Sequence, residues 1–284
     1  MTSDDRLSYR RRKIGQALRR YREERNLTQD AAARLVERSP ASLSAYENGH
    51  RAIRPRDLRQ ILDHYGVTEE KERKRLLDLA AQGRKEGWWR DYMSHEDAFS
   101  VDFASLEAES SRSRSFETVA VPGLLQTEAY TRAVFAAYEP VRVQPRDKNA
   151  IAFRMARQRI LDRPSMRAAW IIGEPVLRLM VGGRDVMRSQ CWKLVEVTER
   201  EHLDLRVVPG TVGAHPGMAG SFTILDVGSD DPMKVVAVDC LTRGWLIDEP
   251  PSIEYYERVY AELQALALSK SDSRALIEAI ASEL

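Results

Sequence analysis

The chain has 284 residues, of which 43% are hydrophobic and 31% charged. This composition is typical of about two globular domains and excludes disordered, collagen-like and membrane classes. No apolar run approaches the roughly 18 residues that span a bilayer, and no apolar stretch follows the basic amino terminus, so we expect a cytoplasmic protein without a signal peptide. Two cysteines and five scattered histidines do not favour a structural zinc site, and we expect neither a metal nor a cofactor.

The formal net charge of +1 hides a difference between the two ends of the chain. Basic residues exceed acidic residues from Met1 to Met93, and acidic residues exceed basic residues in the remainder. Such a division is expected when one domain binds a polyanion and the other has a separate role. A chance distribution of solvated charge is the alternative interpretation.

The first third of the chain predicts five short helices in an all-α domain over residues 1–82. Apolar residues at helical spacing define the first helix. Thr28 can cap the second, and Ser39 with Pro40 supplies an N-cap and a first-turn proline for the third, which Gly49 ends. The predicted helices are residues 13–25, 29–36, 41–48 and 56–66, followed by a fifth that Thr68 caps.

Residues 83–96 are predicted to be a junction, and residues 97–284 a mixed α/β domain with a small sheet and carboxy-terminal helices. Short runs rich in β-branched residues predict strands. They are residues 116–121, 168–173, 205–208, 222–227 and 235–240. Helices are predicted at residues 127–137, 146–162, 174–181 and 184–200, and two more follow near the end of the chain. The expected fold class is therefore α+β.

Two short helices joined by a four-residue turn are the layout of a helix-turn-helix, whose second helix lies in the major groove of DNA. The segment LTQDAAARLVERSPASLSAYENG resembles the phage-repressor (XRE) type of helix-turn-helix. This resemblance implies a five-helix fold that binds double-stranded DNA as a twofold homodimer. It also implies that the third helix presents its side chains to base edges.

Gln29 lies at a helix amino terminus, where its amide and the unbonded backbone N–H groups can hold one phosphate oxygen. A plain N-terminal helix residue is the alternative. The resemblance directs small side chains of the third helix at the bases, which leaves sequence choice to hydroxyl contacts, thymine methyl contacts and DNA shape. These residues are Ser39, Ala41, Ser42 and Ala45.

Longer polar side chains near the third helix are predicted to contact DNA as well. Arg38 is the longest candidate next to that helix. The residues just past the helix are expected to contact backbone phosphates, with a solvated surface as the alternative. They are Asn48, His50, Arg51 and Arg54.

Other residues of the motif are expected to be structural. Arg22 and Glu47 match the oppositely charged pair that, in the resembled family, ties the first helix to the end of the third. Glu37 occupies the turn position where glycine is common, so it either adopts a positive φ at a cost on the order of 1 kcal/mol or the turn is built differently. The residues expected in the core are Leu27, Leu35, Leu43 and Tyr46.

The rest of the chain carries a second resemblance. The segments GWWRDY, VPGLLQTEAYTRAV, RMARQ, LRVVP and VYAELQALALS are similar to the companion domain behind such helix-turn-helix units in many actinomycete regulators, some of them antitoxin-like. The chain departs from that family's acidic pattern, because it has Gly173, Glu174 and Asp239 where two adjacent acidic residues and a glutamate are frequent. The resemblance implies a regulator and leaves its signal open.

Catalytic motifs are missing from the sequence: there is no GxxxxGK[ST], no GxSxG, and no second histidine or cysteine at ligand spacing. We therefore expect a protein that is not an enzyme. The leading hypothesis is a dimeric transcriptional regulator whose second domain receives a small apolar ligand or a small partner protein. The alternative is an antitoxin-like protein that sequesters a partner and binds DNA for autoregulation. An enzyme with a tethered DNA-binding unit is the third interpretation.

Overall fold

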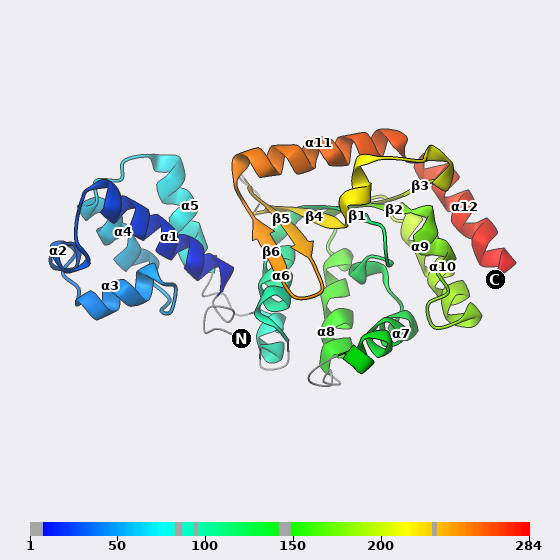
Figure 1. Cartoon of the computed structure of the whole chain (residues 1–284), viewed down its shortest axis with the longest axis horizontal. Coiled ribbons are helices and arrows are strands. Elements are labelled where there is room, and N and C mark those ends of the chain that lie inside the picture. The colour runs from blue at the N-terminus through cyan, green and yellow to red at the C-terminus, as the bar shows by residue number, and fades with distance from the viewer. Residues whose placement is uncertain (1–7, 83–86, 94–95, 142–148, 229–231) are drawn as a thin grey trace. The chain divides into compact units, whose positions relative to one another are not determined.

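The computed structural model describes residues 8–82, 87–93, 96–141, 149–228 and 232–284. The chain divides into two compact units, Met1–Arg90 (unit 1) and Asp91–Leu284 (unit 2), whose elements are labelled in Figure 1. The predicted junction, residues 83–96, includes residues 83–86 and 94–95, which lie outside the described residues. No helix in the described part of the chain is long and apolar enough to cross a bilayer.

Unit 1 contains the five predicted helices. They are α1 (Tyr9–Glu24), α2 (Gln29–Leu35), α3 (Pro40–Glu47), α4 (Pro55–His64) and α5 (Glu70–Gln82). The first begins four residues before the predicted start, because Tyr9 and Arg10 are buried and extend the helical packing surface. The core of this unit includes the fully buried leucines Leu18, Leu43, Leu58, Leu62 and Leu76.

The predicted core of unit 1 needs one clear correction. Leu35 is 41% exposed, whereas its neighbour Val36 is completely buried. The buried stripe of α2 runs through Ala32 and Ala33 to Val36, so Leu35 lies one position off the face that helical spacing directs inward. Leu27 is partly exposed, and the other two predicted core residues are buried.

Unit 2 is built on a six-stranded sheet with the order β3-β2-β1-β4-β5-β6. The three strands β1, β2 and β3 are parallel, and the pairs β1–β4, β4–β5 and β5–β6 are antiparallel. The strands are β1 (Ser110–Glu117), β2 (Arg167–Gly173), β3 (Leu203–Val208), β4 (Phe222–Val227), β5 (Met233–Asp239) and β6 (Gly244–Ile247).

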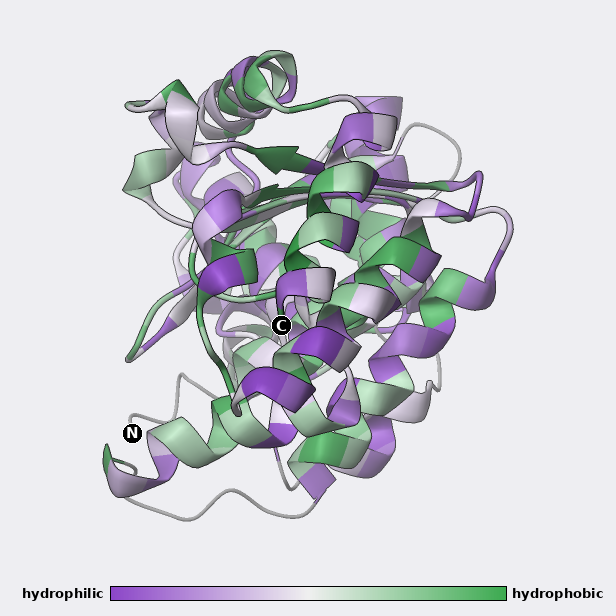
Figure 2. Ribbon diagram, turned by 90° about the vertical axis from the view of Figure 1, so that its right-hand side faces the viewer, coloured by the Kyte–Doolittle hydropathy of each residue, from purple (hydrophilic) through white to green (hydrophobic). Residues whose placement is uncertain are grey.

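Two helical layers enclose this sheet. Helix α11 (Pro250–Leu266) packs Tyr260 and Leu263 on the face that presents Phe116 and Ile224. Figure 1 shows α6, α7, α8 and α10 on the other side of the sheet, and the sheet side chains that point there, including Trp170, pack against α10 and α12. Figure 2 shows the predominantly hydrophobic strands between these layers. Apart from α11, the α-helices described in unit 2 are α6 (Ala98–Glu109), α7 (Glu128–Tyr138), α8 (Asn149–Arg157), α9 (Glu174–Arg178), α10 (Arg184–Thr198) and α12 (Lys270–Glu283).

The predicted boundaries of unit 2 were partly wrong. Strand β1 begins at Ser110 and ends at Glu117, so most of the predicted strand 116–121 is not a strand. The first residues of β1 are polar, so they do not carry the apolar pattern of a strand. Arg114 among them is buried, and its guanidinium forms ion pairs with Asp226 and Glu257 at 3.2 and 2.8 Å. Helix α6 and strand β6 were not predicted at all, and the predicted start of the helix 146–162 lies outside the described residues.

Candidate nucleic-acid interface

The turn between α2 and α3 is held by backbone hydrogen bonds. Glu37 has φ = 54°, so of the two alternatives for this position the structure has the positive φ. The N–H of Arg38 donates to the carbonyl of Ala33 at 2.9 Å, and the N–H of Glu37 donates to that of Arg34 at 3.2 Å. This is the hydrogen-bond pattern of a Schellman motif, which ends a helix through one left-handed residue. The turn is thus geometrically defined without glycine.

Side-chain caps begin both helices of the motif. The hydroxyl of Thr28 accepts from the N–H of Ala31 at 3.2 Å, and the hydroxyl of Ser39 accepts from the N–H of Ser42 at the same distance. Pro40 occupies the first turn of α3, where its missing N–H leaves no hydrogen bond unmade. Local sequence signals therefore set where α2 and α3 start.

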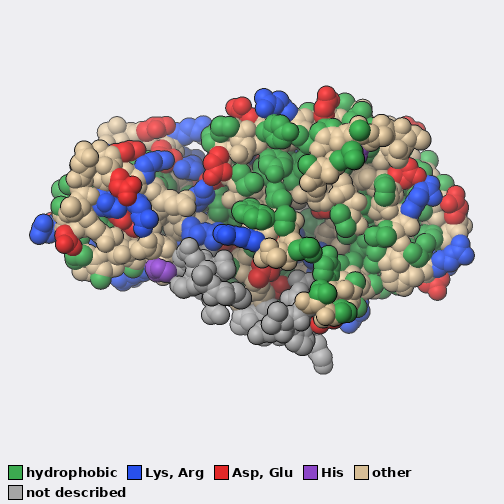
Figure 3. Space-filling view, viewed as in Figure 1, with side chains coloured by type: hydrophobic (Ala, Val, Ile, Leu, Met, Phe, Trp, Pro, Cys, Tyr) green, Lys and Arg blue, Asp and Glu red, His purple; other side chains and the backbone are tan. Residues whose placement is uncertain are grey.

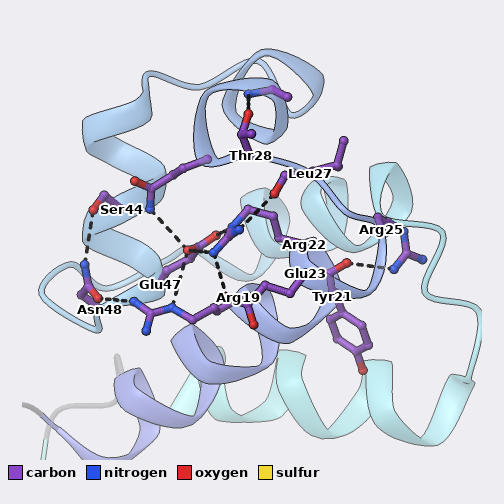
Figure 4. Close-up of polar contacts among 12 residues, drawn as sticks. Arg19, Tyr21, Arg22, Glu23, Arg25, Leu27, Thr28, Ser44, Glu47 and Asn48 are labelled. Carbon is purple, nitrogen blue, oxygen red and sulfur yellow. Dashed lines mark hydrogen bonds and ion pairs between the residues drawn. The ribbon is translucent and has the colours of Figure 1, made fainter.

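The carboxylate of Glu47 joins α1, α2 and α3 (Figure 4). Its side chain is completely buried and accepts from Arg22 Nε at 2.7 Å and Arg22 Nη2 at 3.1 Å. Gln29 Nε2 donates to it at 3.3 Å, and Arg19 Nε lies 3.8 Å from the same carboxylate. The hydrogen bond from Arg22 to Glu47 raises the pKa of the guanidinium, so Arg22 stays protonated. A second Arg22 hydrogen bond, to the carbonyl of Leu27 at 3.0 Å, fixes the connection before α2.

Gly15 allows α1 and α3 to approach closely. A β-carbon at this position would lie 2.4 Å from the carbonyl oxygen of Glu47 and 2.6 Å from that of Tyr46. Both oxygens belong to the backbone and cannot rotate away. Only a residue without a side chain permits this helix crossing, which sets the angle at which α3 is presented.

We expect Gly15→Ala to lower the free energy of unfolding of unit 1 by about 1–3 kcal/mol, because the helices must separate. The loss should occur although alanine favours a helix by about 1 kcal/mol over glycine. Hydrogen exchange of α1 and α3 amides in the full chain measures it. The matched control is Gln16→Ala at the exposed neighbouring position, which should not be destabilising. Equal stability of Gly15→Ala and the unaltered chain would contradict the close-crossing argument.

The structure places the predicted base-facing residues on one short segment. Ser39 and Ala41 are exposed, whereas Ser42 and Ala45 are partly buried. The hydroxyls of Ser39 and Ser42 lie 2.9 Å apart and are hydrogen-bonded to each other, in addition to the capping bond. Contact of these hydroxyls with a base therefore competes with the capping of α3.

The residues past α3 form an exposed polar group. Asn48, His50, Arg51 and Arg54 are all exposed. Asn48 accepts from Arg19 Nη2 at 2.6 Å, and the Arg51 guanidinium lies 5.7 Å from the centre of the Tyr46 ring. Sequence reasoning missed Arg19, although its position one helical turn before Arg22 indicates that the two side chains share a face.

Two further predicted DNA contacts, Arg38 and Gln29, also have intramolecular partners. Arg38 Nη2 lies 3.2 Å from Asp57 Oδ1, so its guanidinium is tied to the start of α4. The Gln29 side chain donates to Glu47, as described above. The backbone N–H groups at the start of α2 still point along the helix axis, as the predicted phosphate clamp at Gln29 requires.

The VPGLLQT segment of unit 2 is a buried polar turn. Gln126 donates to the Val121 carbonyl at 2.7 Å and accepts from the Thr131 hydroxyl at 2.9 Å. Gln190 of α10 donates to the Leu125 carbonyl at 2.8 Å and accepts from the Thr127 N–H at 2.7 Å. The segment therefore fastens the start of α7 to α10, and its amides are structural.

Glu174 and Asp239, the acidic residues at which the chain departs from the resembled pattern, lie on different elements of unit 2. Glu174 begins α9 and accepts from the N–H of Gly210 at 2.9 Å and from Arg178 at 2.8 Å. The Gly210 hydrogen bond, followed by that of Arg178, lowers the pKa of the Glu174 carboxyl. Asp239 ends β5. Glu174 is thus an ionised anchor for the segment that follows β3.

Comparison with known families gives two matches that agree with this geometry. Residues 13–76 match the family described as a helix-turn-helix domain, which indicates that unit 1 is the DNA-binding domain of a regulator. Residues 100–279 match the family described as domain of unknown function (DUF5753). Because this second match covers more than half of the chain, the protein belongs to the DUF5753 family. Searches of curated proteins and of solved structures found no match.

Proposed function

We propose that the protein is a sequence-specific transcriptional regulator that binds double-stranded DNA as a homodimer and whose second domain receives a signal. The observation that carries this proposal is the position of α3. Glu47 and Gly15 hold it rigidly against α1, and Ser39, Ala41 and the exposed residues after its end face solvent. A preorganised helix with basic residues at its end is what reading a groove requires.

The surface of unit 2 supports association with a second chain. The apolar stripe of α11 is not available to a partner, because Ile253, Tyr260 and Leu263 pack on the sheet of the same unit. Exposed apolar residues instead include Trp245 on β6 and Tyr255 on α11. Figure 3 shows hydrophobic side chains gathered near these two elements. Clusters of this kind mark protein interaction surfaces.

The same surface also favours a second candidate function. An antitoxin-like protein that sequesters a small protein would need an exposed apolar face of this kind, and would bind DNA for autoregulation. In either case we propose that unit 2 acts by binding and not by catalysis. Purification of the native chain separates the two candidates: a small protein recovered in stoichiometric amount favours the antitoxin-like role, and a bound metabolite favours sensing.

The phosphate contacts are tested with a DNA site selected from a random pool. We expect Arg51→Ala to weaken binding to cognate and random DNA alike and to reduce the salt slope by about 1, because one phosphate contact is lost. Gln29→Ala should weaken both without changing the slope, since its side chain is neutral. Arg132→Ala, which removes an exposed ion pair with Glu128 in unit 2, is the control. Unchanged affinity and salt dependence in the Gln29→Ala, Arg51→Ala double variant would refute the clamp.

The proposed homodimer is tested by the symmetry and half-site spacing of its DNA operator. Small side chains on α3 give little direct discrimination, so we expect an inverted repeat with half-sites about 10 bp, roughly 34 Å, apart or a multiple of that. Removal of the chain after Gln82 should reduce affinity for the complete operator far more than for one half-site. Light scattering and footprinting provide the measurements. A strictly monomeric full chain that protects one non-palindromic site would contradict the homodimer.

A further inference from the structure

Unit 2 contains a cavity of about 250 Å³ beside the VPGLLQT segment. Its walls come from that segment, from α8 and the 3₁₀ turn after it, and from α10. Leu124, Met155 and Val197 supply an apolar side, and Lys193, Arg159 and Arg200 supply cationic groups. A concave, partly apolar site with a few polar groups is the usual form of a small-molecule site.

Lys193 is the distinctive residue of this cavity. Its ammonium donates to the Gln126 carbonyl and to Gln158 Oε1, both at 2.8 Å. Both acceptors are neutral, and no carboxylate among the described residues lies within ion-pair distance of Nζ. An ammonium has three N–H donors, so one donor remains for a further acceptor.

The electrostatic surroundings of Lys193 favour the binding of an anion. Burial lowers the pKa of its ammonium, an effect that Glu196 opposes and Arg200 reinforces. A partly desolvated cation is stabilised by an opposite charge at close range. Arg159 and Arg200 add positive charge at the cavity, although Arg200 also lies 3.5 Å from Asp162. The cationic groups outnumber the two carboxylates, Asp162 and Glu196, that line it.

We propose that this cavity binds a small organic carboxylate with a short apolar chain. Its carboxylate accepts from Lys193, and its chain lies against Leu124, Met155 and Val197. The cavity is smaller than the roughly 300–1,000 Å³ of drug-sized sites, which restricts the ligand to a short chain. This inference rests on the proposed signal-receiving role of unit 2. Lys193 would connect the ligand to the rest of the unit, because it also donates to the turn that fastens α7 to α10.

The first test uses hexanoate, hexanol and hexylammonium as probes of the full-length chain. Methionine labelled with ¹³C at the methyl group reports on Met155, whose signal is assigned with Met155→Leu. We expect hexanoate to shift this signal and to bind roughly ten- to a hundredfold more tightly than hexanol, as a charge-assisted hydrogen bond requires. Equal binding of hexanoate and hexanol, preference for hexylammonium, or no shift with hexanoate would overturn the proposal.

The second test removes the ammonium. Lys193→Met keeps the apolar stem, and we expect it to weaken hexanoate binding by the same ten- to hundredfold factor. The matched control is Lys270→Met, because Lys270, like Lys193, donates to two neutral oxygens, here the carbonyls of Arg200 and Leu203 at 3.0 and 2.7 Å, but does not itself line the cavity. Wild-type affinity in Lys193→Met would refute the site. If that variant does not fold, the three probes on the unaltered chain still decide.

These measurements contain no DNA, so they are independent of the proposed regulator. A chain that binds hexanoate through Lys193 but no DNA retains the site and contradicts the regulator. A chain that binds its operator but does not bind hexanoate retains the regulator and contradicts the site.

Discussion

Replacing Glu47 with alanine should lower the free energy of unfolding of unit 1 by about 3–5 kcal/mol, the loss expected when one partner of a buried ion pair is removed. The Glu47 side chain is completely buried and bonds both Arg22 and Gln29. Without it, the largely buried Arg22 guanidinium keeps its charge and loses its buried counterion, while the exposed Glu23 carboxylate remains 3.3 Å away. Hydrogen exchange of α1 and α3 amides in the full chain measures the change for this unit separately.

A surface pair provides the matched control for Glu47. Arg20 and Glu24 lie 3.7 Å apart on α1 with about half of each side chain exposed, so Glu24→Ala should cost less than about 1 kcal/mol. A double-mutant cycle with Arg22→Met isolates the coupling between Arg22 and Glu47. Coupling near zero would show that the carboxylate does not tie α1 to α3. In that case the DNA-reading helix would depend on other contacts.

Gln126→Leu should destabilise unit 2 by about 2–6 kcal/mol, because two buried groups lose their partners and each costs about 1–3 kcal/mol. The carbonyl of Val121 loses its donor, and the hydroxyl of Thr131 loses its acceptor. Leucine has a similar volume, so the loss reports hydrogen bonding and not a cavity. Hydrogen exchange of α7 and α10 amides is the measurement.

The control for Gln126 is Gln264→Leu, an exposed glutamine on α11, which should change stability by no more than about 0.5 kcal/mol. If Gln126→Leu changes stability as little as this control does, water replaces the lost partners and the VPGLLQT turn is not held by its amides. In that case the turn would be held next to the cavity by the hydrogen bonds that Lys193 and Gln158 donate to the Gln126 carbonyl.

Local features of the chain were predictable where the physics is local. Helical spacing, the hydroxyls of Thr28 and Ser39 and the proline at position 40 identified α2 and α3, because capping and periodicity involve residues a few positions apart. For Glu37 the sequence left two alternatives, a positive φ or a different turn, and the structure decided for the positive φ. The family resemblance predicted the pair of Arg22 and Glu47. The structure shows that the pair is bidentate and that the Glu47 side chain is buried.

Other parts of the fold were not predictable because their stability comes from residues distant in the sequence. Strand β1 starts in the polar run SSRSRS, where β-propensity is low, and it forms because β2 and β4 pair with it on both sides. The polar interior position of Arg114 depends on Asp226 and Glu257, more than a hundred residues away. Neither relation has a local signal.

By itself, the sequence determined the five helices of unit 1 and the motif between α2 and α3, because these depend on spacing along one segment. Tertiary structure decided which faces are covered. It buried Val36 and left Leu35 exposed, it packed the α11 stripe on the sheet, and it placed Lys193 next to Gln126 and Gln158. The physical reason is that burial and electrostatic pairing depend on which distant segments meet, and spacing along one segment does not encode that.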